Sequence, residues 1–171
     1  HLSPFEEFQR FKTHPNIRKF LEGGKRIAYG ARALTAGGLQ SLPKLTFPGG
    51  VLVGDDAGFL NAARIKGSHC AIKSGMMAAE ACFDALASER QRDELTAYPE
   101  AFKQSWLYEE LHQARNFKPW MSKGLKYGAI MFGIDQLIFG GKAPWTLHNT
   151  TPDHAKLKLA SECPLITYPK P

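Results

Sequence analysis

Cysteine is scarce in this chain of 171 residues: there are three, Cys70, Cys82 and Cys163, and no C-x-x-C pair. A disulfide-stapled scaffold uses an even and larger set, and a four-iron cluster needs four thiolate ligands, so the chain by itself builds neither. The low, odd count also favours a reducing compartment. We expect Cys70 and Cys82 to fall on one helix and to pack as small apolar residues.

Three other features are missing. No G-x-G-x-x-G follows a strand, which excludes the usual βαβ unit that binds a dinucleotide pyrophosphate. No apolar stretch reaches the roughly twenty residues of a membrane-spanning helix, and no signal peptide is visible. The net charge of +6 favours anionic lipid headgroups or an acidic protein partner. Nucleic acid is the weaker interpretation, because the basic residues are spread along the chain and no binding motif occurs.

Helical signals dominate what is present, so we expect an α+β fold that is rich in helix and has a small sheet. A serine cap, a proline and two glutamates start the first helix, which ends at Pro15. The further expected elements are a short helix at 16–22, a strand-like segment at 25–34, an edge strand or loop at 39–46, a buried strand at 51–53, and helices at about 67–87 and 94–115.

The helix at 67–87 has two readable faces. We expect the larger apolar side chains to form a core stripe and the small ones to permit close approach to a sheet. The core stripe comprises Ile72, Met76, Ala79, Phe83 and Leu86, and the small stripe comprises Ala71, Gly75, Ala78 and Cys82. In the helix at 94–115, Pro99 marks a break or the true start, and Glu109, Glu110 and His112 are interpreted as a solvated face.

The most informative stretch is 47–86, where an apolar strand runs into Gly54-Asp55 and a helix opens a dozen residues later. Gly54 lets a ligand lie against the backbone, and Asp55 offers a carboxylate at the end of the strand. Gly67, Ser68 and His69 open a helix whose free N–H groups suit a partly anionic group. This order of parts suits a flavin, with Asp55 on the ribityl hydroxyls and the helix start at the N1/O2 edge. By itself, Gly-Asp is usually a surface turn, and Ser68 is equally a flavin donor or an N-cap.

The segment 118–145 is the second stretch whose pattern indicates a function. Lysines flank it, and Trp120 and Trp145 stand near its ends. One helical face carries Tyr127, Ile130, Met131, Ile134 and Ile138. This pattern is typical of a helix that lies in the bilayer interface. The alternative, an ordinary buried amphipathic helix, is preferred on these residues alone.

Four blocks of sequence carry a resemblance to a known family: GGKRIAYGARAL at 23–34, GGLQSLPKLTFPGG at 37–50, the segment 57–80 with RIKGSH and KSGM, and the closing segment 144–171. On these blocks the chain resembles the electron transfer flavoprotein–ubiquinone oxidoreductase family over essentially its whole length. The resemblance reverses the preference for a buried helix at 118–145, because this region matches the part of the family's quinone domain that dips into the membrane.

The resemblance implies a membrane-associated flavoenzyme that passes electrons from reduced electron transfer flavoprotein, through FAD and a 4Fe-4S cluster, to ubiquinone. It places the dinucleotide motif upstream of this chain and the four cluster cysteines downstream, so we expect an internal segment that is inactive alone. Gly54, Asp55, Gly67, Ser68 and His69 are the expected flavin contacts. Asp55 departs from the small uncharged residue that is frequent there in the family.

The resemblance also implies a domain division. Residues 1–46 belong to the quinone-binding domain, 47–90 to the C-terminal strand–turn–helix of the FAD domain, 91–150 to a helical membrane-contact region, and 151–171 to a linker. The expected location is peripheral, on the cytoplasmic face of the bacterial inner membrane or the matrix face of the mitochondrial inner membrane. The competing hypothesis is a non-catalytic module that binds a membrane surface or another protein.

Overall fold

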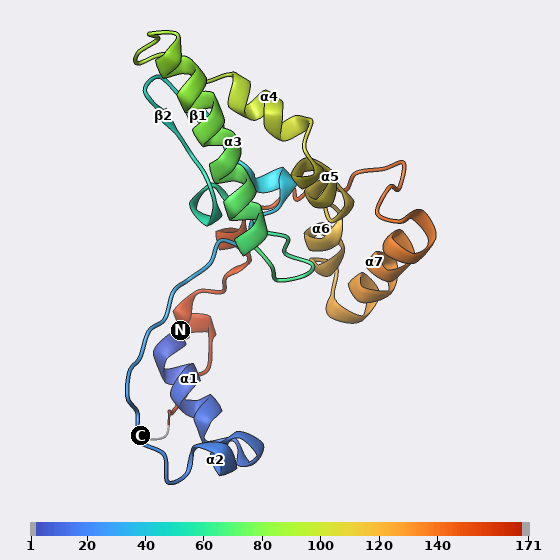
Figure 1. Ribbon diagram of the computed structural model, residues 1–171. Helices are drawn as coiled ribbons and strands as arrows, with labels where there is room; N and C mark the ends of the chain where they lie inside the picture. Colours follow the sequence, from blue (N-terminus) through green and yellow to red (C-terminus); the bar gives the residue numbers. More distant parts are fainter. Residues whose placement is uncertain (1–2, 169–171) are drawn as a thin grey trace. The chain divides into compact units, whose positions relative to one another are not determined.

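The computed structural model describes residues 3–168, which divide into two compact units. One unit is His1–Arg32 together with Thr150–Pro171, and the other is Ala33–Asn149. The described part is rich in helix and carries one two-stranded antiparallel sheet, which agrees with the predicted α+β class (Figure 1). The Pro169–Pro171 end of the predicted linker lies outside the described residues.

The unit that contains the first 32 residues is built from short helices. Helix α1 (Pro4–Lys12) begins at Ser3, whose Oγ accepts a hydrogen bond from the Glu6 N–H at 3.4 Å, as the sequence predicts. The other elements are α2 (Pro15–Leu21) and the 3-10 turns η3 (Asp153–Lys156) and η4 (Ala160–Glu162). Within this unit, Tyr168 links the C-terminal segment to helix α1, because its hydroxyl donates a hydrogen bond to Glu7 Oε1 at 2.9 Å.

The strand predicted at 25–34 is wrong. The segment is extended but makes no ladder with any described residue, and Ile27 is 97% exposed. Alternation of apolar and polar residues makes a strand only where a neighbouring strand accepts its N–H groups, and the described chain provides none.

The second unit holds the hydrophobic core. Its hairpin pairs β1 (Thr46–Phe47) with β2 (Gly50–Val51) in the register Thr46↔Val51, and Gly49 adopts φ +80° in the turn. The buried strand predicted at 51–53 is therefore confirmed as a strand only at Val51, and its predicted burial is wrong, because Val51 and Leu52 are half-buried and Val53 is 37% exposed. Leu52 donates one more bond to Leu45 O at 2.8 Å, after which Gly54 turns the chain away.

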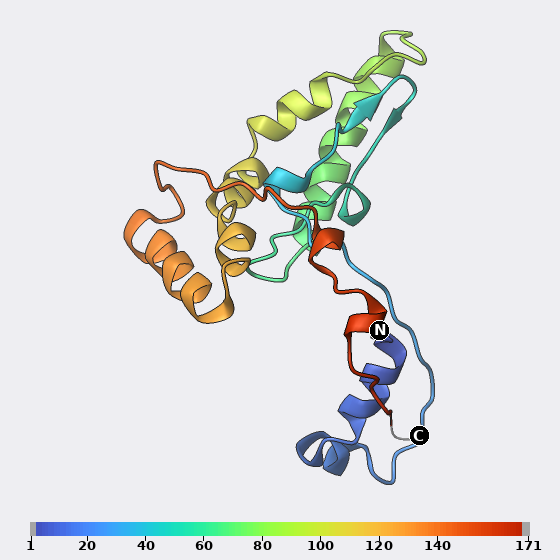
Figure 2. The same ribbon diagram turned by 180° about the vertical axis from the view of Figure 1, so that it is seen from behind.

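Helix α3 (Ser68–Ala87) packs beside the hairpin and against α4 (Ala97–Lys103) (Figure 2). Its bounds match the prediction, but its buried face does not. The large side chains of the expected core stripe are exposed by 51% to 71%, and Ala79 is exposed as well. The face of α3 that is buried instead carries mostly small side chains, and only Ala78 of it belongs to the expected small stripe. Its residues are Cys70, Ser74, Met77, Ala78, Ala81 and Ala85. Small side chains on this face let the hairpin and α4 approach the helix closely.

The predicted helix at 94–115 is two helices, α4 and α5 (Trp106–Gln113). Pro99 lies in the first turn of α4, as the alternative of a true start predicts. The break comes at Ser105, whose Oγ donates to Phe102 O at 2.7 Å and accepts from the Tyr108 N–H at 3.4 Å. Ser105 therefore ends one helix and caps the next.

Helices α6 (Phe117–Met121) and α7 (Leu125–Phe139) form an antiparallel pair that ends at Gly140, in the left-handed conformation. Buried Arg115 binds the main chain of the segment that follows α7. Its guanidinium donates to the carbonyl oxygens of Gly141, Ala143 and Trp145 at 2.8, 2.6 and 3.0 Å. The short turn η1 (Leu39–Ser41) completes the unit together with η2 (Asp55–Ala57). No helix among residues 3–168 combines the length and apolar character needed to cross a bilayer.

Candidate functional site

Asp55 and the first turn of α3 share one open hollow of about 530 Å³, a size typical of small-molecule sites. The sequence predicts that these two elements face a common ligand, and the structure brings them together. The hollow is lined by Leu34, Asp55, Leu60, Ile65, Lys66, Gly67, Ser68, His69 and Ala71.

Gly54 positions a lining residue of the hollow without lining it. Its φ of +65° and ψ of −149° fit glycine almost exclusively, and its N–H donates to the buried Ser74 Oγ at 2.9 Å. A Cβ added to Gly54 would lie 3.5 Å from the Ala71 methyl group of α3. Gly54 thus turns the chain against the helix and aims Asp55, and it is not among the residues that line the hollow.

The start of α3 is open to the hollow. Gly67 is the N-cap, and within residues 3–168 no side chain caps this end of the helix. The first-turn N–H groups are therefore available to an acceptor, with the positive end of the helix dipole behind them. Ser68 is the first helical residue and is exposed, so of its two interpretations the N-cap is wrong.

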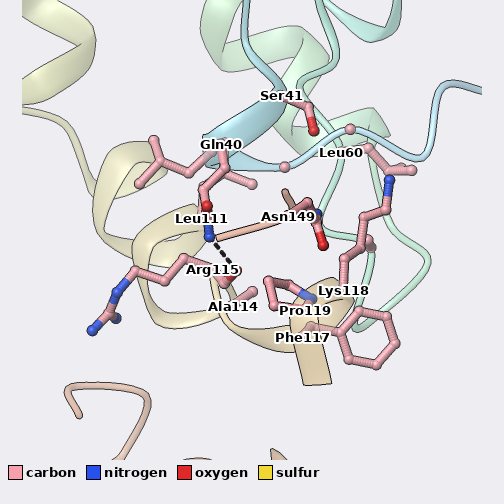
Figure 3. Close-up of a pocket in the computed structure, with 14 residues that line it drawn as sticks. Gln40, Ser41, Leu60, Leu111, Ala114, Arg115, Phe117, Lys118, Pro119 and Asn149 are labelled. Atoms are coloured by element: carbon pink, nitrogen blue, oxygen red, sulfur yellow. Dashed lines mark hydrogen bonds between the residues drawn. The ribbon is translucent and has the colours of Figure 1, made fainter. Parts of the chain in front are cut away.

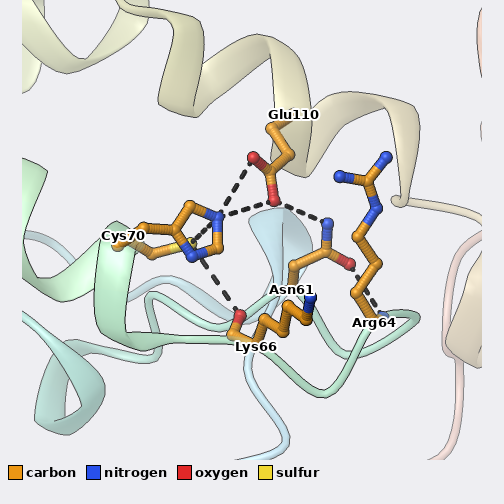
Figure 4. A network of polar contacts seen from close by, with 6 residues as sticks. Asn61, Arg64, Lys66, Cys70 and Glu110 are labelled. Atoms are coloured by element: carbon orange, nitrogen blue, oxygen red, sulfur yellow. Dashed lines mark hydrogen bonds and ion pairs between the residues drawn. The ribbon is translucent and has the colours of Figure 1, made fainter.

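His69 belongs to a polar network that the sequence does not predict (Figure 4). Its Nε2 lies 3.0 and 3.1 Å from the two carboxylate oxygens of Glu110 on α5, and its ring stacks on Trp106 at a centroid distance of 5.9 Å. Asn61 donates to Glu110 Oε1 at 2.8 Å. The Cys70 Sγ lies 3.5 Å from the same imidazole nitrogen.

The network keeps Glu110 charged. Burial raises the pKa of its carboxyl, but the hydrogen bonds from Asn61 and His69 and the charges of His69 and Arg64 outweigh it, so the pKa lies below its ordinary value. Burial, with Glu110 beside it, raises the pKa of the Cys70 thiol. Cys70 is fully buried, as predicted, whereas the interpretation of Glu110 as a solvated residue is wrong.

Helix α7 carries the predicted apolar face on the outside. Ile130 is 64% exposed, Tyr127, Ile134 and Ile138 are also exposed, and Met131 is half-buried. The alternative of an ordinary buried helix does not describe this face. Trp120 departs from the expected position at an interface, because it is buried and packs edge-on against Tyr127 at 6.0 Å.

A second pocket lies between η1 and the α5–α6 corner (Figure 3). The side-chain amide of Gln40 crosses it, donating to Arg115 O at 2.8 Å and to Leu147 O at 2.9 Å. Its enclosed volume is about 20 Å³, room for roughly one water molecule. This pocket is a packing feature and is too small for a cofactor.

Comparison with known proteins points in one direction. The family model described as "ETF-QO, ubiquinone-binding" matches residues 1–34. The electron transfer flavoprotein–ubiquinone oxidoreductase of Pseudomonas aeruginosa is 60% identical over 176 aligned residues, which take in 100% of this chain and 31% of that protein.

The mitochondrial proteins of the same name from Rattus norvegicus and Homo sapiens are 53% and 51% identical over 178 aligned residues. Each alignment takes in 100% of this chain and 29% of the relative. The chain therefore spans about three tenths of the length of these curated relatives.

Proposed function

We propose, from the premise that this chain belongs along its whole length to the electron transfer flavoprotein–ubiquinone oxidoreductase family, that it serves as a segment of a membrane-associated flavoenzyme. The enzyme passes electrons from reduced electron transfer flavoprotein, through FAD and a 4Fe-4S cluster, to ubiquinone. The names of the relatives support the donor and the acceptor, and the match at residues 1–34 supports a quinone-binding role for residues 1–46.

The observation that carries the proposal is the hollow shared by Asp55 and the first turn of α3. Its parts fit the chemistry of a flavin: a carboxylate that accepts hydrogen bonds, a helix start without a capping side chain, and apolar walls from Leu34, Leu60 and Ile65. FAD, when bound, supplies the redox chemistry, and the protein supplies position and electrostatics.

In this proposal the polar elements of the hollow have separate binding roles. Asp55 accepts hydrogen bonds from ribityl hydroxyls. The backbone at Gly67, Ser68 and His69 faces the N1/O2 edge, where negative charge collects on reduction, and the dipole of a 20-residue helix favours that charge. Gly54 holds Asp55 in place through its bond to Ser74. No residue of the hollow acts as a general acid or base.

The membrane-contact part of the proposal falls on α7, within residues 91–150. A helix of 15 residues is about 22 Å long, shorter than the roughly 30 Å of a bilayer core, so it would lie in the interface. The exposed side chains of Tyr127, Ile130, Ile134 and Ile138 would enter the acyl boundary and border the path of the quinone tail. Location is then peripheral, on the cytoplasmic face of a bacterial inner membrane or the matrix face of the mitochondrial one.

The decisive experiment replaces Asp55 in the full-length protein and compares it with its neighbour. Asp55→Ala should lower retained FAD several-fold, read as flavin absorbance per polypeptide after gel filtration. Asp56 is exposed and does not line the hollow, so Asp56→Ala should retain the wild-type amount. Equal retention in both variants would refute the ribityl role of Asp55. A colourless full-length protein would instead favour the non-catalytic membrane-binding or protein-binding module.

A further inference from the structure

Three metal-ligating side chains of different kinds meet beside the hollow. His69 Nε2, Cys70 Sγ and a carboxylate oxygen of Glu110 all lie within 4.8 Å of one another (Figure 4). Two come from the first turn of α3 and the third from α5, so the cluster exists only in the folded chain. Nothing in the proposed flavin role uses the thiol or the carboxylate.

We propose that His69, Cys70 and Glu110 form a binding site for a divalent transition metal of the Zn²⁺ class. Zinc–nitrogen and zinc–sulfur bonds of about 2.0 to 2.3 Å in a tetrahedron place neighbouring ligand atoms roughly 3.4 to 3.6 Å apart. Here His69 Nε2 lies 3.5 Å from Cys70 Sγ and 3.0 Å from Glu110 Oε1. The third pair, Cys70 Sγ and a Glu110 oxygen, lies within 4.8 Å, so rotation of the carboxylate toward the thiol would bring all three donors around one ion.

The surroundings supply the second layer that metal ligands require. Asn61 donates to Glu110 Oε1 at 2.8 Å and orients the carboxylate, and Trp106 stacks on the imidazole and fixes the plane of the ring. The His69 side chain is 40% exposed, which leaves a coordination position for solvent. Arg64 and Lys66 lie beside the cluster and their charges oppose a cation, and a carboxylate and a thiolate bound to the metal would supply two negative charges that balance them.

The donor set selects the metal. One thiolate, one imidazole and one carboxylate suit Zn²⁺ or Co²⁺, whereas Mg²⁺ and Ca²⁺ prefer sites made of oxygen alone. Binding replaces the hydrogen bond between His69 and Glu110 by two metal–ligand bonds, and the proton that Nε2 donates in that hydrogen bond moves to Nδ1, which leaves Nε2 free to bind the metal. Coordination by a thiolate also releases the Cys70 thiol proton to solvent.

Co²⁺ titration of the full-length protein tests the proposal when exchangeable divalent metals are first removed with EDTA and any iron–sulfur cluster is left intact. The readout is the difference spectrum and needs no flavin, so its outcome is independent of the proposed function. We expect one Co²⁺ per chain, a near-ultraviolet thiolate-to-cobalt absorption band, release of about one proton, and displacement by Zn²⁺. Cys70→Ser should abolish the band and weaken binding by at least about tenfold. Cys82→Ser is the matched control: it removes a half-buried thiol from the same helix and should change nothing.

Glu110→Gln gives a second arm in case Cys70→Ser folds poorly, because it keeps the shape of the side chain and removes one anionic ligand. It should weaken Zn²⁺ binding while circular dichroism stays unchanged. Saturation of the wild type with Co²⁺ and no thiolate band would overturn the proposal. Equal binding by Cys70→Ser, or loss of binding in Cys82→Ser, would overturn it as well.

Discussion

Glu110 and His69 stand 41 positions apart in the sequence, yet their side chains meet at 3.0 Å. On its own helix Glu110 follows another glutamate, and that pattern is typical of a solvated face. Only the packing of α5 against the start of α3 turns this carboxylate inward. By contrast, the proximity of Asp55 to Gly67–His69 could be predicted, because one short loop joins the two elements.

The lowered pKa of Glu110 predicts a pH dependence of stability. The folded state binds its proton less readily than the unfolded chain, whose ordinary value is 4.5, so the unfolded chain takes up more protons near that pH. The stabilisation from Glu110 is complete above pH 4.5 and is lost as the pH falls through the lower, folded-state pKa. Urea denaturation between pH 7 and pH 3 should show a shallower loss in Glu110→Gln.

Glu109→Gln is the control for this measurement, because Glu109 is exposed and its ion pair with Lys142 at 3.3 Å lies in solvent. It should follow the wild-type curve. If the two variants lose stability in parallel, the network around Glu110 does not carry the effect.

At the scale of elements, the existence and bounds of α1, α2 and α3 follow from caps, prolines and periodicity. Which face of α3 is buried does not follow, because both stripes have helical spacing. The larger stripe would normally face the core, yet the hairpin and α4 pack on the side where Ala78, Ala81 and Ala85 let them approach. The choice depends on which elements are neighbours, and periodicity within one helix carries no such information.

The α6–α7 pair offers a matched test of close packing. A Cβ at Gly128 would lie 2.5 Å from the Trp120 carbonyl oxygen, whereas one at Gly133 on the same helix meets no atom within 4 Å among the described residues. Gly128→Ala should therefore lower the free energy of unfolding by about 1 to 3 kcal/mol. Gly133→Ala should leave it unchanged or raise it by up to about 1 kcal/mol, since alanine favours helix.

Thermal and urea denaturation of the two variants provide the measurement. The contrast between them matters more than either value, because both add the same methyl group to α7. Equal stability of the two variants would mean that the close approach of Gly128 to the Trp120 carbonyl group does not hold α6 and α7 together.

At the scale of the whole molecule, several helices present large apolar side chains to solvent, among them α1 with Phe5, Phe8 and Phe11 and the longer helices α3 and α7. On α3 these are Ile72, Met76, Phe83 and Leu86, and on α7 they are Tyr127, Ile130, Ile134 and Ile138. Patches of this kind mark surfaces that meet a partner or a membrane. Lysines flank α7, at Lys123, Lys126 and Lys142, and an apolar face with cationic residues at its ends is typical of a helix that an anionic bilayer attracts.

The proposed membrane contact of α7 predicts which face binds lipid. In the full-length protein, Ile130→Glu with Ile134→Glu should reduce sedimentation with anionic liposomes by at least about tenfold, because two charges would enter the acyl boundary. Ile72→Glu on α3 is the control: this side chain is 65% exposed, much like Ile130 at 64%, and the change should leave lipid binding intact. Undiminished sedimentation of the α7 variant would refute the membrane role of this helix.

The hydrogen bonds from Arg115 to the segment after α7 limit which changes of length and of sequence this segment can accept. Its guanidinium contacts carbonyl oxygens of the main chain at positions 141, 143 and 145, and those groups are the same whatever side chain the residue bears. The spacing of these carbonyl groups is thus constrained. Side chains are constrained at Gly141, where a Cβ would meet Gln113, and at Ala143, which is buried. Exchange of the exposed side chains in the segment 141–145 should be tolerated far better than lengthening or shortening this segment by one residue.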